Sequence, residues 1–129
     1  MLGYGVENGK LVERSISFRN FIENKKFYTL GCDDVNSDGR SDVFISNWGT
    51  AEKPDIYINL SDREFALVDP EKIPKADASF DGAHALYEDV TGDGVRDMVY
   101  IARSPSVNAN SLRFQVFRGE RRITSNDLK

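Results

Sequence analysis

The sequence has 129 residues, which is long enough for one domain with a modest hydrophobic core. Its 40% hydrophobic and 29% charged residues exclude a disordered chain, and no run approaches the roughly 20 apolar residues that a membrane span requires, so we expect no membrane insertion. The net charge of −4, without a Lys/Arg stripe interleaved with aromatic residues, argues against a nucleic-acid partner.

The chain begins with two short β patterns, residues 2–6 and 11–18, joined by the hairpin turn Glu7-Asn8-Gly9. Residues 20–26 then form a polar connection. The first nine residues lack both a basic region and a long apolar stretch, so we expect no signal peptide there.

A first unit follows over residues 27–80. Its β patterns cover residues 27–31, 43–46, 56–60 and 65–68, and the connection after them carries Pro70 and Pro74 with room for one helical turn. The second unit, residues 81–129, repeats the plan with β patterns at residues 83–87, 98–102, 112–117 and 122–124 and a polar insertion at 104–111. The sequence therefore predicts an all-β chain of antiparallel, four-stranded units, about two and a half in number, in a single repeat domain. A repeat of this kind is typical of solenoids and propellers.

Each unit has an oxygen-rich loop between its first two strands: residues 34–42 in the first and residues 89–97 in the second. In both loops, side chains at positions 1, 3 and 5 converge when the chain coils tightly, and a glycine at position 6 permits the sharp turn. Position 7 offers a backbone carbonyl and position 9 a further carboxylate. Oxygen donors in this number suit calcium better than a transition metal, so we expect two Ca²⁺ sites. The predicted ligands are Asp34, Asn36, Asp38, Arg40 and Asp42 in the first site, and Asp89, Thr91, Asp93, Val95 and Asp97 in the second.

Two other interpretations of these loops were considered. An EF-hand requires a bidentate Glu at position 12 and flanking helices, whereas this chain has Ile45 and Tyr100 there, within β patterns. A polar turn without metal remains open, because Asp, Asn, Ser and Gly also populate turns for local hydrogen-bonding reasons.

The residues around the loops, 31–45 and 87–99, resemble the FG-GAP/VCBS repeat, and the run Asp55-Ile56-Tyr57-Ile58-Asn59 is similar to the third strand of that repeat. The resemblance implies blades of an integrin α-type β-propeller with calcium in both loops. In these terms residues 1–26 are the outer hairpin of a partial blade, 27–80 blade one and 81–129 blade two. The Phe-Gly…Gly-Ala-Pro signature is degenerate here, with Phe80-Asp81-Gly82-Ala83-His84 as its counterpart. Propellers have about 4–8 blades, so the resemblance favours a fragment or self-association of copies into a complete ring.

The sequence offers no set of catalytic residues. The only His and Cys, His84 and Cys32, are far apart in sequence, and we expect the first to be packed or hydrogen-bonded and the second to be buried. Trp48 is the best candidate for ligand contact, because an indole on a loop can stack on a sugar or anchor a protein, although a place over the blade core or at an inter-blade seam is favoured for it. The aromatic residues expected in the core are Tyr57, Phe65, Tyr100, Phe114 and Phe117.

These features favour a non-catalytic binding or adhesion module for a protein or a glycan, located outside the cell or on its surface. The location follows from loose calcium loops, since extracellular modules bind at about 10⁻⁴–10⁻³ M. The alternative is an accessory propeller segment of a larger secreted enzyme or toxin.

Overall fold

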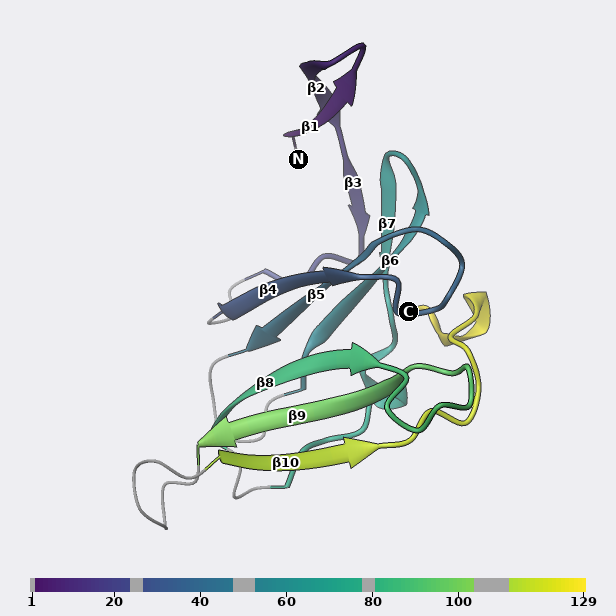
Figure 1. The fold of residues 1–129 in the computed structure, drawn as a ribbon. Helices are drawn as coiled ribbons and strands as arrows, with labels where there is room; N and C mark the ends of the chain where they lie inside the picture. The colour runs from purple at the N-terminus through teal and green to yellow at the C-terminus, as the bar shows by residue number, and fades with distance from the viewer. Residues whose placement is uncertain (1, 24–26, 48–52, 78–80, 104–111) are drawn as a thin grey trace.

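The computed structural model of the chain describes residues 2–23, 27–47, 53–77, 81–103 and 112–129 (Figure 1). In these residues the secondary structure is β-strand apart from two short 3₁₀ turns, η1 (Pro70–Lys72) and η2 (Ser125–Asp127). No helix in the described part of the chain is long and apolar enough to cross a membrane. The strands are β1 (Leu2–Glu7), β2 (Lys10–Ser15), β3 (Ser17–Arg19), β4 (Phe27–Asp33), β5 (Asp42–Asn47), β6 (Asp55–Ser61), β7 (Glu64–Leu67), β8 (Asp81–Glu88), β9 (Asp97–Arg103) and β10 (Leu112–Phe117).

The first large sheet has the strand order β3-β7-β6-β5-β4. Strands β4 to β7 form the antiparallel meander that the sequence predicted for the first unit, and each strand follows its neighbour through a short connection. Strand β6 is buried over its first four residues, because both faces of this sheet are covered. The prediction of antiparallel pairing alone is wrong at the outer edge, where β3 joins β7 in parallel.

The second large sheet has three strands, in the order β10-β9-β8, where the sequence predicted four. Residues 122–124 do not form the expected fourth strand. The carboxylate of Asp127 accepts hydrogen bonds from the amide and hydroxyl of Thr124, which turn the chain into η2. From there Leu128 forms an isolated β-bridge with Val68, so this segment crosses to the first sheet and does not extend its own.

The N-terminal hairpin of β1 and β2 turns at the predicted place, through Asn8 (φ 49°) and Gly9 (φ 74°), and Glu7 is the last residue of β1, opposite Lys10. The predicted strand over residues 11–18 is divided: β2 ends at Ser15, and β3 continues to the edge of the first sheet. In Figure 1 the hairpin projects away from the two large sheets.

Two hydrophobic clusters hold the fold together. The larger lies between the two large sheets, where the rings of Phe44 and Tyr87 meet at 5.0 Å between centroids. The smaller lies on the other face of the first sheet, around Tyr57. Tyr57 and Tyr100 are buried as predicted, and Phe65 and Phe117 are partly buried against the two clusters.

Two burial predictions are wrong. The ring of Phe114 is exposed, because its position on β10 faces away from the first sheet. Cys32 is also exposed, on β4, which is the edge strand of the first sheet.

Candidate metal centre

The first loop connects β4 to β5 and coils around the carboxylate of Asp34. Its Oδ1 accepts a hydrogen bond from the amide of Asp38, and its Oδ2 accepts one from the amide of Gly39, both at 2.9 Å. The coil requires left-handed backbone at Ser37 (φ 60°) and at Gly39 (φ 89°), which explains the glycine at position 6. Asn36 Oδ1 accepts from the amide of Asp38 at 3.2 Å, so the side chains at positions 1 and 3 both turn toward position 5.

The second loop, between β8 and β9, has the same construction around Asp89. Its Oδ1 accepts from the amides of Gly92 (2.7 Å) and Asp93 (3.0 Å), and its Oδ2 accepts from the amide of Gly94 (2.8 Å). Two sequences that share only the loop pattern therefore fold into the same turn, with the position 1 carboxylate at its centre.

The position 5 carboxylates each contact a guanidinium group as well as a loop amide. Asp38 accepts from the amide and from Nη2 of Arg40, at 2.9 and 3.1 Å. Asp93 accepts from the amide of Val95 at 2.9 Å and from Nε and Nη2 of Arg118 at 3.1 and 3.0 Å. A cationic group thus sits on the corresponding oxygen of both loops, although the two arginines come from different parts of the chain.

These contacts keep both position 5 acids ionised. Burial opposes ionisation of Asp38, but hydrogen bonds from the amide of Arg40 and from Asn36 outweigh it and lower the pKa of the carboxyl. The amide of Val95, followed by Arg118, lowers the pKa of Asp93. Both carboxylates therefore carry a full negative charge at neutral pH.

The position 9 carboxylates, Asp42 and Asp97, are buried. Asp42 Oδ2 accepts from the amide of Val35 at 2.9 Å, and its Oδ1 accepts from the amide of Asn59, on β6, at 2.8 Å. Asp42 therefore ties its loop to the third strand of the sheet.

Asp97 ties the second loop to the chain after β10 in the same way. Its Oδ2 accepts from the amides of Val90 and Thr91 at 3.0 Å and from the Thr91 hydroxyl at 3.1 Å, and its Oδ1 accepts from the amide of Gly119 at 2.8 Å. Burial raises the pKa of the Asp42 carboxyl, whereas at Asp97 the hydrogen bonds, with that of Gly119 the largest, outweigh burial and lower it.

Asn59 is a residue of the first site that the sequence analysis missed. Its side-chain nitrogen donates to the carbonyl of Ser41 at 3.1 Å, while its Oδ1 is buried and has no hydrogen-bond partner in the described part of the chain. The first loop therefore has an unsatisfied oxygen acceptor beside it. The second loop has Gly119 at the corresponding place, which has no side chain.

Among the described residues, no three His, Cys, Asp or Glu side chains are gathered closely enough to form a metal-binding group. The carboxylates are satisfied by loop amides and by arginines in this structure. The donor chemistry nevertheless fits a hard cation. Every predicted side-chain donor is an oxygen, and a guanidinium already occupies the cationic place at position 5 of each loop.

An ion pair that the sequence did not indicate joins the two loop regions. Arg96, at position 8 of the second loop, donates from Nη1 to Asp33 at the end of β4 (3.1 Å) and to Glu88 at the end of β8 (3.1 Å). The two predicted sites are therefore held together across the junction of the two sheets.

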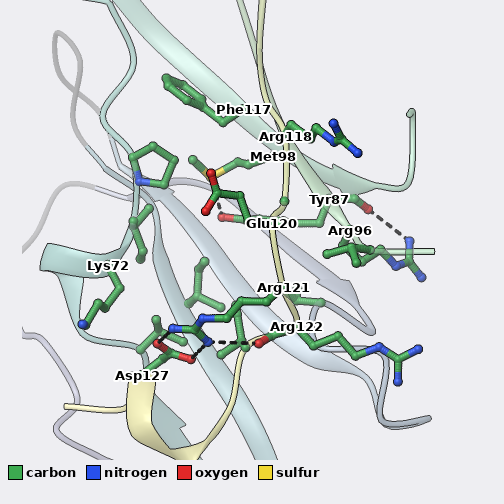
Figure 2. Close-up of a pocket in the computed structure, with 18 residues that line it drawn as sticks. Lys72, Tyr87, Arg96, Met98, Phe117, Arg118, Glu120, Arg121, Arg122 and Asp127 are labelled. Atoms are coloured by element: carbon green, nitrogen blue, oxygen red, sulfur yellow. Dashed lines mark hydrogen bonds and ion pairs between the residues drawn. The ribbon is translucent and has the colours of Figure 1, made fainter. Parts of the chain in front are cut away.

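A cavity of about 280 Å³ lies between the sheets, and residues 117–123 form one of its walls (Figure 2). Core residues such as Val68, Ile73 and Met98 line it from within. At its mouth Arg121 pairs with Asp127 at 2.6 and 2.7 Å, which holds the pKa of that carboxyl well below its usual range. The charged turn at residues 118–122 thus belongs to an inter-sheet wall.

Trp48 lies outside the described residues. His84 Nδ1 lies 2.7 Å from the hydroxyl of Thr29, so the histidine is hydrogen-bonded between the two sheets, as expected.

A family model described as FG-GAP-like repeat matches residues 34–100, more than half of the chain. The match begins at the first residue of the first loop and ends in β9, so it covers both loops. No curated protein and no solved structure matches the chain. On the family match, the chain belongs to the FG-GAP-like repeat family.

Proposed function

We propose that the chain is a calcium-binding module of the β-propeller type, which acts as a non-catalytic binding or adhesion domain for a protein or a glycan outside the cell. The observation that carries the proposal is the identical construction of the two loops. In each, the position 1 carboxylate organises the turn, and an ionised position 5 carboxylate has a cationic group beside it.

Calcium would replace the guanidinium groups at Asp38 and Asp93. It would also link these carboxylates to those of Asp34 and Asp89, which accept hydrogen bonds from loop amides in this structure. Binding to the folded state alone stabilises it by RT ln(1 + [L]/Kd), about 1.4 kcal/mol per site at a tenfold excess over Kd. We therefore expect EDTA to lower the melting temperature and excess calcium to restore it. A melting temperature that does not respond to either would rule out the metal.

Single substitutions separate the two sites. Asp38→Ala removes a charged donor and should weaken calcium binding at the first site more than Thr91→Ala weakens it at the second, because the Thr91 hydroxyl already donates to Asp97. Asp62→Ala, in the exposed turn between β6 and β7, is the matched control and should leave the calcium affinity unchanged. Isothermal titration of the three variants measures these differences.

The partner is best tested through Trp48, since an indole can stack on a sugar or anchor a protein. Binding to a glycan array that is lost in Trp48→Ala would support a carbohydrate ligand. Retained binding would exclude this residue as the contact. The acidic net charge and the absence of a long apolar run support a partner other than nucleic acid or the membrane interior.

The second candidate function is an accessory propeller segment of a larger secreted enzyme or toxin. In this alternative the catalytic chemistry belongs to another domain, in keeping with the separation in sequence of the single His84 and the single Cys32. The neighbouring reading frame would distinguish the two, because this alternative requires a catalytic domain in the same polypeptide. Self-association of copies into a larger ring is a further part of the proposal.

A further inference from the structure

The outer face of the second large sheet is apolar, and its side chains on β8 and β10 are exposed, whereas Val99 on the central strand is buried. Register places Leu86, Val99 and Val116 side by side across β8, β9 and β10, and places Phe114 beside Ile101 in the next row. Phe114, Val116 and Leu86 are 63%, 50% and 39% exposed. A row of apolar side chains on the face of a sheet normally packs against another layer.

The first sheet shows how this chain covers the equivalent face. There Ile45, Tyr57 and Leu67 pack against Phe21 and Ile22, which follow β3, and against Phe18 at the edge of the same sheet. Phe18 contacts Tyr57 edge-on at 5.3 Å between ring centroids. The described residues therefore bury the centre of one outer face, whereas Leu86, Phe114 and Val116 remain exposed on the other.

The projecting β1–β2 hairpin also has an exposed apolar face, which packs on no sheet of the described structure. Tyr4, Val6 and Leu11 are 69%, 69% and 74% exposed. Tyr4 and Val6 alternate along β1, and Val6 is directly opposite Leu11 in the hairpin register, so the three side chains lie on one face.

The hairpin is fixed far from the second sheet of its own chain. Strand β3 follows β2 directly and is paired with β7, with the amide of Ser17 bonded to the carbonyl of Arg63 at 2.8 Å. The ring of Phe18 stacks on Phe65 at 4.9 Å. Figure 1 shows the hairpin and strands β8 to β10 at opposite ends of the molecule. The two exposed apolar surfaces do not meet within the described structure, and a second copy can bring them together.

We propose that the β1–β2 hairpin of one copy packs, through Tyr4, Val6 and Leu11, on the outer face of β8–β10 of a second copy. The contact is heterologous, so each copy offers one hairpin and accepts another, and the assembly grows head to tail until it closes. This inference deepens the self-association part of the proposed function, and neither surface includes a predicted metal ligand.

Light scattering on size-exclusion chromatography of the full chain tests the contact over a series of concentrations in calcium. We expect the mass of the wild type to rise above that of a monomer, and Leu11→Lys and Phe114→Lys each to remain monomeric. Leu30→Lys, at a 65% exposed position on β4 outside both surfaces, is the matched control and should associate as the wild type does. Because all three positions are exposed, unchanged circular dichroism and melting should confirm that each variant is folded.

The decisive measurement is a mixture of the two monomeric variants. The Leu11→Lys copy retains an intact sheet face, and the Phe114→Lys copy retains an intact hairpin, so the mixture should form a one-to-one dimer that grows no further. A strictly monomeric wild type, an associating Leu11→Lys variant, or a mixture that stays monomeric would each overturn the proposal. If the melting temperature does not respond to calcium but the copies still associate, the calcium site is refuted and the contact between copies is supported.

Discussion

The buried carboxylate of Asp42 offers the sharpest test of how the loops are built, through the nearly isosteric change Asp42→Asn. Both carboxylate oxygens accept backbone amides, from Val35 and from Asn59. An amide side chain retains one acceptor and turns an N–H toward the other donor. Hydrogen bonds to charged groups contribute about 1.5–3 kcal/mol, and an unpaired buried donor costs about 1–3 kcal/mol. Burial already raises the pKa of this carboxyl, so loss of the negative charge alone should lower the free energy of unfolding only slightly. With the altered hydrogen bonds included, we expect a destabilisation of about 2–4 kcal/mol.

The assay is urea unfolding with and without EDTA, followed by thermal melting. For a chain of this size the expected loss corresponds to roughly 8–15 °C in melting temperature. The loss should persist in EDTA, because the lost hydrogen bonds are within the protein. Asp38→Asn, at the more exposed position 5, should change stability in EDTA by less than about 1 kcal/mol. An Asp42→Asn variant as stable as wild type in EDTA would refute a structural role and leave Asp42 as a metal ligand only.

Two further predictions concern the segment after β10. The pKa of Asp127 is depressed in the folded state, first by Arg121 and then by Thr124, so its stabilising contribution is complete above the ordinary carboxyl pKa of about 3.9 and is lost as the pH falls toward the depressed value. Asp127→Asn should therefore flatten the acid side of the stability profile in urea unfolding, and an unchanged profile would contradict the pairing. Gly119→Ala places a Cβ 2.2 Å from the carbonyl oxygen of Arg96 and should cost about 1–3 kcal/mol in chemical denaturation, whereas a neutral result would show that the backbone there adjusts freely.

Much of the strand order could be predicted from the sequence. The alternating and β-branched runs around residues 43–46, 56–60 and 98–102 mark strands whose side chains are fixed by burial on at least one face, and local pattern is sufficient there. The parallel pairing of β3 with β7 could not be predicted, since it depends on Phe18 meeting Phe65 from a distant part of the chain. The missing fourth strand has a similar cause, because Asp127 and Leu128 bind elsewhere.

At the candidate site the sequence pattern identified the loops and the turn-forming positions. It did not predict which carboxylates are buried and which are accessible. Asp38 and Asp42 look alike in sequence, yet one is accessible and contacts an arginine while the other is buried between two amides. Asp42 and Asp97 are the first residues of strands, and this position could have distinguished them from the carboxylates within the loops. Asn59 and Arg96 carry no motif and required the three-dimensional structure.

The C-terminal residues connect three stretches of chain that are distant in sequence. The carbonyl of Asp127 accepts the amide of Asp69, the amide of Lys129 donates to Leu67, and the carbonyl of Lys129 accepts the side chain of Asn20. Contacts between residues so far apart in sequence slow folding, because the intervening chain loses conformational entropy before the contacts can form. They also join the residue after β3, the end of β7 and the end of the second repeat, so we expect loss of any one of these contacts to weaken the other two.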